Sequence, residues 1–164
     1  MSLEQHPDVR ETRSLTVSAI YGSERWTRFL LQAALFSAYA ISDAKLKLTG
    51  DSKRDGARAY LLSRVGKVRL DANNLWRDSA SARIALSALR PYAWAVEEPI
   101  QPRDWEGMLQ LAHATGLSMI LDESVRSLRD LDAVPAGANF ILNLRVSKLG
   151  GLARTLHIDR KSVV

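Results

Sequence analysis

Several features that would identify a site or a compartment are missing from this 164-residue sequence. It has no cysteine, which excludes a disulfide framework, a thiolate metal site and a cysteine nucleophile, and which favours a reducing, cytoplasmic location. Its histidines, His6, His113 and His157, do not have the spacing of a metal site. The net charge of +5 is scattered instead of forming a basic block with interleaved aromatics, so we expect no nucleic-acid partner.

The sequence also lacks a long hydrophobic run. Its most apolar stretch, residues 29–41, is about a dozen residues long, which is too short for a bilayer core of about 30 Å. The stretch also lies too far from the first residue to be a signal peptide. We therefore expect a buried helix at 29–41 and no membrane partner.

The remaining composition is that of an ordinary globular chain, with 46% hydrophobic and 25% charged residues. Residues 1–14 are polar and aperiodic, and we expect a flexible leader there. Residues 15–157 carry the periodic patterns of one domain, whereas residues 158–164 carry none and are expected to form an unstructured tail. A closed barrel of eight strand-helix units typically needs about 250 residues, so this chain is short for one.

Strand and helix patterns alternate along the domain. The sequence predicts strands at 15–21, 43–48, 67–71, 94–97, 118–122 and 140–146. It predicts helices at 26–40, 52–64, 79–89, 104–115, 127–134 and 152–157, with Asp78 or Ser79 as an N-cap. The alternation predicts an α/β fold with a parallel sheet, of the (β/α) barrel type and with about six of the eight units.

Three of the predicted strands end in a carboxylate. Asp71, Glu97 and Asp122 follow one another at intervals of about 25 residues, which is one strand, one helix and two loops. Because parallel strands place their carboxyl ends at one edge of a sheet, we expect these side chains to lie close together. Three carboxylates form a hard oxygen cage that suits Mg²⁺ and leaves room for a substrate oxygen.

Two lysines, Lys45 and Lys47, alternate on the strand before these carboxylates. Two ammonium groups on one face lower each other's pKa, which would free one lysine to act as a base. A metal ion would then stabilise a developing oxyanion while the lysine moves a proton on the adjacent carbon. Glu98 and Glu123 are expected to point to the other side, as solvated or outer neighbours.

Each feature has a simpler interpretation. A carboxylate at a strand end is often a helix N-cap or a solvated loop residue, and alternating lysines often protect a sheet edge. A doubly wound phosphoacceptor domain with clustered aspartates is a further alternative, but the Gly-rich phosphate loop and paired first-strand acids are missing. The regular interval favours a common site over these separate explanations.

The motifs together resemble the enolase superfamily, and within it the muconate-lactonising and mandelate-racemase-like enzymes, dipeptide epimerases and succinylbenzoate synthases. The resemblance spans 43–151. Its motifs are Lys45-x-Lys47, Leu-Asp71-Ala-Asn73, Glu97-Glu-Pro99, Leu-Asp122-Glu-Ser124 and Asn143-Leu-Arg145-Val-Ser-Lys148-Leu-Gly150-Gly151.

The resemblance implies a (β/α) barrel in which Asp71, Glu97 and Asp122 bind Mg²⁺. It implies that Lys47 removes the proton α to the carboxylate of a small substrate, that Lys45 tunes Lys47, and that Asn73 lies near the metal. The resulting enediolate would lead to racemisation, epimerisation, cycloisomerisation or dehydration.

The sequence departs from the family pattern at the sixth predicted strand. Arg145 stands where the family has its second catalytic lysine, and Lys148, three residues on, is expected to point to the other face. An arginine is a poor base but a good partner for a carboxylate or an oxyanion. We therefore expect one-base chemistry by Lys47 instead of a two-base proton transfer.

The sequence also contains no counterpart of the family's N-terminal capping domain or of its seventh and eighth barrel strands. An open six-stranded sheet leaves two edges exposed. Two hypotheses follow. Either the chain is an active lyase, isomerase or racemase whose open barrel is completed by a homo-oligomer, or it is a truncated and catalytically inactive fragment of such an enzyme.

Overall fold

The computed structural model describes residues 17–135, 138 and 140–162. The described strands are β1 (Ala19–Tyr21), β2 (Asp43–Lys47), β3 (Lys67–Asp71), β4 (Ala95–Glu97), β5 (Ser118–Leu121) and β6 (Phe140–Leu142). The described helices are α1 (Trp26–Ala38), α2 (Ser52–Ser63), α3 (Ser79–Leu89), α4 (Trp105–Thr115), α5 (Leu128–Asp132) and α6 (Leu152–Ser162), with a short 3-10 turn at Arg90–Tyr92.

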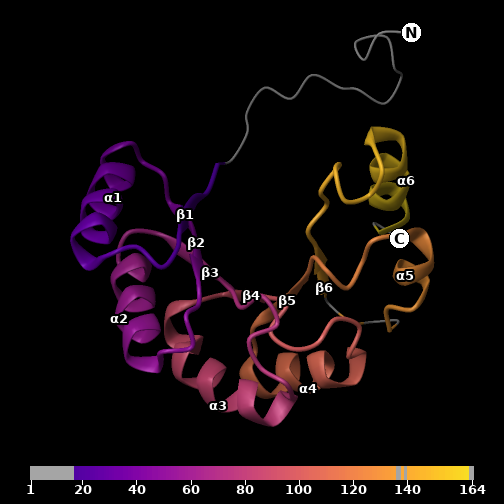
Figure 1. Ribbon diagram of the computed structural model, residues 1–164, viewed down its shortest axis with the longest axis horizontal. Coiled ribbons are helices and arrows are strands. Elements are labelled where there is room, and N and C mark those ends of the chain that lie inside the picture. Colours follow the sequence, from indigo (N-terminus) through magenta and orange to yellow (C-terminus); the bar gives the residue numbers. More distant parts are fainter. Residues whose placement is uncertain (1–16, 136–137, 139, 163–164) are drawn as a thin grey trace, which may run out of the picture.

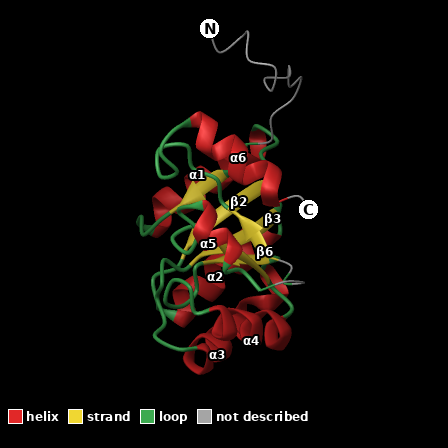
Figure 2. Ribbon diagram, turned by 90° about the vertical axis from the view of Figure 1, so that its right-hand side faces the viewer, coloured by secondary structure: helices red, strands yellow, loops and turns green. Residues whose placement is uncertain are grey.

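The strands form one parallel sheet in the order β1-β2-β3-β4-β5-β6. Figure 1 shows the strands along an arc with the helices on its outer side, so the sheet is curved and its concave face is open. In Figure 2, seen from the β6 side, α5 and α6 lie nearest the viewer. This arrangement confirms the partial (β/α) barrel and excludes the doubly wound alternative, which needs helices on both faces of the sheet.

One face of the strands packs against the helices. Leu46, Leu70, Val96 and Leu121 belong to the buried core and are at most 1% exposed. Burying one such side chain stabilises a fold by about 1.5–3 kcal/mol. This layer fixes the register of each strand, because a shift by one residue would turn these side chains toward the concave face.

The sequence located the elements closely, and α3 has the predicted bounds, with the Asp78 carboxylate accepting from the Ser81 N–H at 2.8 Å as the N-cap. Two strands are shorter than predicted: β1 begins at Ala19 instead of 15, and β6 ends at Leu142 instead of 146. Beyond Asn143, whose N–H donates to the Leu121 carbonyl at 2.8 Å, the chain leaves the sheet and turns. The Arg145 carbonyl accepts from two later N–H groups in this turn.

The prediction of an unstructured tail from residue 158 is wrong for 158–162, because α6 continues to Ser162. Ile158 is buried, and Lys161 forms an ion pair with Asp132, so contacts with distant residues stabilise the helix end. Seven residues are too few to show a helical hydrophobic period in the sequence. The expected leader, 1–14, and residues 163–164 lie outside the described residues.

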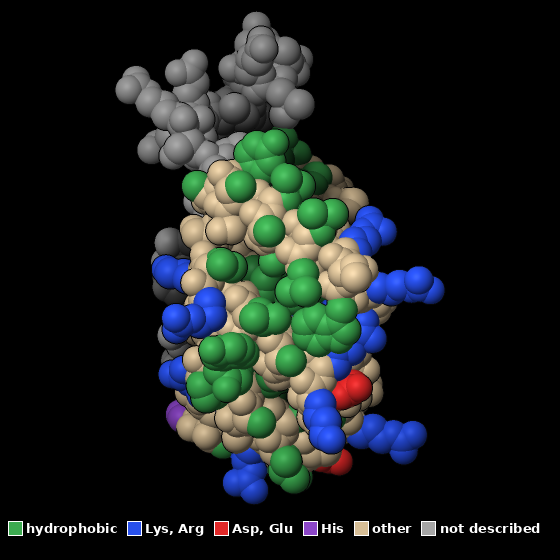
Figure 3. All heavy atoms as spheres, turned by 90° about the vertical axis from the view of Figure 1, so that its left-hand side faces the viewer, with side chains coloured by type: hydrophobic (Ala, Val, Ile, Leu, Met, Phe, Trp, Pro, Cys, Tyr) green, Lys and Arg blue, Asp and Glu red, His purple; other side chains and the backbone are tan. Residues whose placement is uncertain are grey.

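Helix α1 is not the buried helix that its composition predicted. Phe29 is its one buried residue and packs edge-on against Tyr21, with ring centroids 5.5 Å apart. Figure 3 shows hydrophobic side chains gathered on this side of the molecule, and the exposed ones of α1 include Leu30, Leu31 and Leu35. The helix covers the edge strand β1, and no described element covers its outer side. Among the described residues, no helix is long and apolar enough to cross a membrane.

Candidate active site at the strand ends

Three buried carboxylates lie at the carboxyl ends of three neighbouring strands. Asp71 is paired in register with Glu97, and Glu97 with Ile120, so Asp122, two residues further on, points to the same concave face. All three residues are at most 6% exposed. Because an isolated buried carboxylate is strongly disfavoured, the site must supply positive charge or hydrogen-bond donors to each.

Lys45 supplies that charge to two of them. Its Nζ lies 3.1 Å from Asp71 Oδ2 and 2.6 Å from Glu97 Oε2. Burial lowers the pKa of Lys45, but the hydrogen bonds and negative charges of Glu97 and Asp71 outweigh burial and raise it overall. The expectation that the two lysines lower each other's pKa is therefore wrong for Lys45, which remains an ammonium group.

Lys47 and Asn73 lie at the rim. Lys47 is paired in register with Asp71 at the end of β2, and its exposed side chain has no ion-pair partner among the described residues. Asn73 follows β3 in the left-handed backbone region at φ 50°, a conformation that asparagine tolerates. Its side chain is exposed and makes no hydrogen bond to a described residue, and its expected place near a metal ion stays a prediction.

Asp122 is held by two cations. Arg145 Nε donates to Asp122 Oδ1 at 3.0 Å, and a second guanidinium nitrogen pairs with Oδ2. Lys148 Nζ lies 2.8 Å from Oδ1. Burial raises the pKa of Asp122, but the hydrogen bonds from Lys148 and Arg145 outweigh burial and lower it overall.

The prediction that Lys148 points to the other face is wrong. Strand alternation stops at Leu142, and the turn that follows returns Lys148 to the concave side. Glu123 also belongs to this side, because its Oε1 lies 2.8 Å from Lys148 Nζ and 3.4 Å from Arg145. The expectation that Glu123 is a solvated neighbour on the opposite side is therefore wrong. Glu123 lies beyond the end of β5, where side chains no longer alternate between the two faces of the sheet.

Asn143 opens the last of the family-like motifs, but the sequence did not assign it a role in the site. Its side-chain nitrogen donates to Glu97 Oε1 at 2.8 Å. The available signal was its position, because it follows β6 on the same face as Ile120 and Ala95. An uncharged polar residue at the end of one strand is therefore a candidate site residue when a nearby strand of the same sheet ends in a carboxylate.

Glu98 is fully buried instead of solvated. Its Oε1 accepts from the Asp122 N–H at 2.7 Å and the Ser124 N–H at 2.6 Å, and its Oε2 accepts from the Ser124 hydroxyl at 2.8 Å. Burial raises the pKa of Glu98, against the lowering effect of these donors. The residue has φ 41°, so the backbone is turned to reach this network. Glu98 thus fixes the loop that carries Asp122.

The donor set fits Mg²⁺ in its chemistry, because three buried carboxylates at adjacent strand ends offer hard oxygen ligands. In the structure, however, these carboxylates are arranged as ion pairs and not as a metal site. Among the described residues, no group of three or more acidic or histidine side chains is placed to hold a metal ion. Lys45 occupies the space between Asp71 and Glu97, and Asp122 turns to Arg145 and Lys148.

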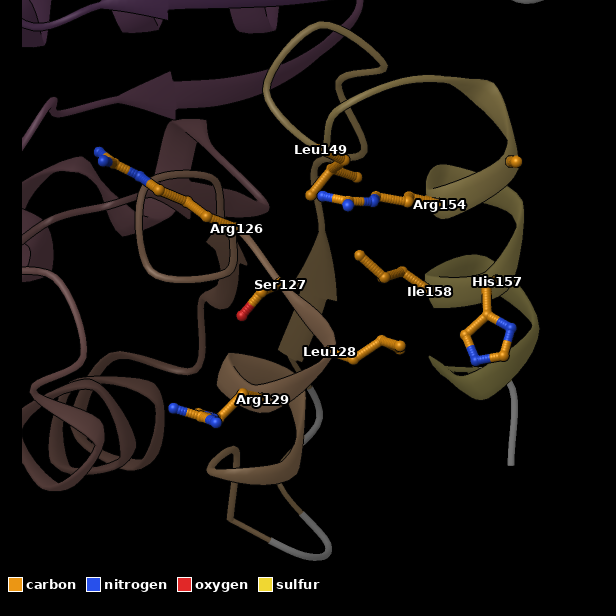
Figure 4. Close-up of a pocket in the computed structure, with 9 residues that line it drawn as sticks. Arg126, Ser127, Leu128, Arg129, Leu149, Arg154, His157 and Ile158 are labelled. Atoms are coloured by element: carbon orange, nitrogen blue, oxygen red, sulfur yellow. The ribbon is translucent and has the colours of Figure 1, made fainter.

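Two hollows bear on where a ligand could bind. One of about 150 Å³ lies on the concave face beside Lys45, Arg69, Glu97 and Asn143. A larger one of about 500 Å³ lies between α5 and α6, where the apolar side chains of Leu128 and Ile158 point toward each other (Figure 4). None of the strand-end carboxylates lines the larger hollow, whereas Glu97 lines the smaller one, which therefore adjoins the cluster.

The fold and the charged strand ends define a partial (β/α) barrel with acid-base groups at the carboxyl edge of its sheet. The family described as "Enolase C-terminal domain-like" matches residues 29–160, and the chain belongs to this family. The match covers every strand from β2 to β6 and therefore all the residues of the cluster.

Similar proteins include enzymes with different activities. The chain is 32% identical over 96 residues to a hydrophobic dipeptide epimerase of Enterococcus faecalis, covering 57% of this chain and 27% of the relative. It is 27% identical over 128 residues to a chloromuconate cycloisomerase of Cupriavidus pinatubonensis, covering 75% and 33%.

Solved structures agree with the fold. A muconate cycloisomerase variant superposes with a TM-score of 0.81 at 25% identity, covering 93% of this chain and 44% of that one. The muconate lactonising enzyme of Pseudomonas putida gives 0.75 at 26% identity, covering 90% and 44%. The chain thus spans about a third of the curated relatives and less than half of these structures.

Proposed function

We propose that the strand-end cluster abstracts a proton α to a carboxylate in a small substrate, with Lys47 as the single base. The observation that carries the proposal is the position of Lys47: it lies at the end of β2, in register with Asp71, and its ammonium group has no ion-pair partner among the described residues. Lys45, in contrast, is bound to two carboxylates. Lys47 is therefore the lysine available to meet a substrate.

In this proposal Asp71, Glu97 and Asp122 would hold Mg²⁺. When bound, the ion would act as a Lewis acid toward the substrate carboxylate and so favour loss of the α-proton. The neutral amine of Lys47 would accept that proton at Nζ, and negative charge would develop on the substrate's carboxylate oxygens as an enediolate. Lys45, held as an ammonium group next to this position, would add positive charge without taking the proton.

Arg145 determines which outcomes are favoured. A guanidinium group is essentially never deprotonated, so Arg145 would not supply a second base on the opposite side of the α-carbon. The proposed chemistry therefore removes and returns the proton on one face of the α-carbon. This fits a cycloisomerisation, a dehydration or isotope exchange with retention of configuration. The epimerase and cycloisomerase relatives both fit a carboxylate substrate class.

Isotope exchange tests the proposal. The 164-residue chain is incubated in D₂O with Mg²⁺ and a panel of N-acyl amino acids, dipeptides, sugar acids and a muconate, and α-deuteration is followed by NMR. We expect exchange that disappears in Lys47→Ala and persists in Lys53→Ala, because Lys53 is an exposed lysine of α2 outside the site.

The competing hypothesis is the catalytically inactive fragment. It predicts no exchange with any substrate and no rise in thermal stability on adding Mg²⁺. Absence of exchange with every substrate would refute the enzyme proposal, and absence of the Mg²⁺ effect as well would support a fragment that binds no metal.

We further propose a second copy of the chain as the partner that covers the open sheet. Both edge strands, β1 and β6, have one side free of described strands, and α1 exposes Leu31 and Leu35 beside β1. Light scattering after size-exclusion chromatography should give a dimer or larger species. Leu31→Lys should shift it toward the monomer, whereas Leu61→Lys, on the exposed side of α2, should not. A monomer at every concentration would contradict this part of the proposal.

A further inference from the structure

We propose that Arg145 is a displaceable counter-cation for Asp122, and that it sets how strongly the strand-end carboxylates bind a divalent cation. The inference rests on the proposed function, because it takes these carboxylates as the metal ligands. It goes further in assigning Arg145 a role toward the metal in place of the role of a base.

The first support is that Arg145 leaves no oxygen of Asp122 free. Its guanidinium meets the carboxylate side-on, with Nε 3.0 Å from Oδ1 and a second nitrogen on Oδ2. Lys148 shares Oδ1 at 2.8 Å. A two-pronged arginine contact of this kind is among the stronger charge-assisted hydrogen bonds and fixes the carboxylate plane. Both oxygens of Asp122 therefore already accept from a cation, and a metal ion must bind Asp122 beside these cations or displace one of them.

The second support is electrostatic. A divalent ion binds a carboxylate oxygen at about 2 Å, and would then stand within about 4 Å of the two cations on Asp122. At such short range like charges repel strongly in the low effective dielectric of a partly buried site. The ion and the guanidinium group therefore compete for Asp122 instead of sharing it.

The third support is that Arg145 is the cation best able to leave. Its side chain is 45% exposed, against 26% for Lys148 and 15% for Lys45. It also extends from the turn after β6 and not from a strand of the sheet. When the guanidinium group swings out, water can solvate it at once, whereas Lys45 would have to leave a buried position between two carboxylates.

An arginine and a lysine are not equivalent here. A lysine at position 145 would keep the positive charge but could make only a point contact, without the planar fork that occupies both oxygens of Asp122. The structure therefore predicts graded competition from position 145: strongest with arginine, weaker with lysine, and absent with a neutral residue of similar length, which leaves Lys148 as the cation on Asp122.

The test measures metal binding directly, without substrate. Mn²⁺ is titrated into the full chain and its variants, and the free ion is followed by electron paramagnetic resonance. We expect Arg145→Gln to raise the Mn²⁺ association constant about tenfold or more, which is within the range of coupling between competing ligands. Arg145→Lys should lie between Arg145→Gln and the wild type.

Two controls separate this effect from a change in net charge. Arg83→Gln removes an exposed arginine of α3, outside the site, and should leave Mn²⁺ binding unchanged. Asp122→Asn, added to Arg145→Gln, should abolish the gain, because the gain must come through Asp122. Circular dichroism of each variant verifies that it is folded.

The inference is overturned if Arg145→Gln binds Mn²⁺ no more tightly than the wild type, or if the gain survives Asp122→Asn. These outcomes are distinct from failure of the proposed function. Tighter binding without α-deuteration would support the counter-cation and refute the enzyme. Exchange in the wild type with no gain in Arg145→Gln would support the enzyme and refute the counter-cation.

Discussion

Two adjacent glutamates at the end of β4 lie in two different layers of the molecule. Glu97 faces the concave side, where it meets the ammonium group of Lys45 and the amide of Asn143. Glu98 lies behind it, fully buried, where two backbone N–H groups and the Ser124 hydroxyl are its donors. The concave layer balances carboxylates with cations, and the buried layer satisfies a carboxylate with neutral dipoles alone.

This difference appears in the direction of the pKa shifts. In the concave layer the cations outweigh burial and lower the pKa of Asp122. In the buried layer the neutral donors do not outweigh burial, and the pKa of Glu98 is raised. The ion pairs of the concave layer can therefore rearrange when a ligand binds. The hydrogen bonds of the buried layer fix the loop that carries Asp122.

The largest effect is expected from removing the shared cation of the concave layer. Lys45→Met leaves Asp71 and Glu97 buried without their ammonium partner, and breaking a buried pair in this way costs about 3–5 kcal/mol. Urea unfolding followed by circular dichroism measures the loss. Lys53→Met, at an exposed position of α2, should change stability far less. Equal stability of the Lys45→Met variant and the wild type would show that the cluster is not held by charge.

The next effect concerns the buried layer. Glu98→Ala leaves the Asp122 and Ser124 N–H groups without an acceptor, and each unsatisfied buried group costs about 1–3 kcal/mol. Glu98→Gln should lose much less, because its carbonyl oxygen can accept both N–H groups and its amide can donate to the Ser124 hydroxyl. The same urea unfolding compares the two variants. If they were equally unstable, the charge of Glu98 and not its hydrogen bonds would hold the loop.

Lowering the pH should change the stability contributions of Glu98 and Asp122 in opposite directions. The raised pKa of Glu98 means that the native state holds its proton more tightly, so stability relative to Glu98→Gln is greatest below the ordinary value of 4.5 and is lost as pH rises through the raised pKa. The lowered pKa of Asp122 has the opposite sign: its contribution is present above the ordinary value of 3.8 and is lost as pH falls through the lowered pKa.

Unfolding free energies of the wild type, Glu98→Gln and Asp122→Asn between pH 3 and pH 8 provide the measurement. The difference between the wild type and Glu98→Gln should grow in favour of the wild type as pH falls. The difference between the wild type and Asp122→Asn should shrink. Parallel profiles for the two variants would remove the distinction between the layers.

The sequence predicted the strand-end positions well because they follow from local signals. Apolar strands ending in Asp71, Glu97 and Asp122 at a regular interval place these residues at one sheet edge whatever the details of packing. Alternation also gives the face correctly as long as the chain remains a strand. It failed for Lys148 and Glu123, which follow the ends of β6 and β5, because a turn does not preserve a period of two.

What the sequence could not show depends on contacts between distant segments. The contact between Arg145 and Asp122 joins two loops, and the burial of Glu98 depends on the loop around Ser124 folding over it. Helix α1 shows the opposite case, in which an expected contact is missing. Its apolar composition predicted burial, but burial also requires a neighbour, and only the Phe29 side has one among the described residues.

The smallest effect is expected at Asp78, which lies in neither layer and sharpens the comparison between them. Like Glu98, it accepts from a backbone N–H and a serine hydroxyl, both of Ser81 and both at 2.8 Å. Unlike Glu98, it is exposed, and these donors lower its pKa. Asp78→Ala should destabilise the protein less than Glu98→Ala, which affects the loop after β5. The loss of stability in Asp78→Ala should vanish as pH falls through the lowered pKa of Asp78. The unfolding series above would measure it. A similar pH dependence for Asp78→Ala and Glu98→Ala would mean that the type of donor, and not burial, sets the direction of the shift.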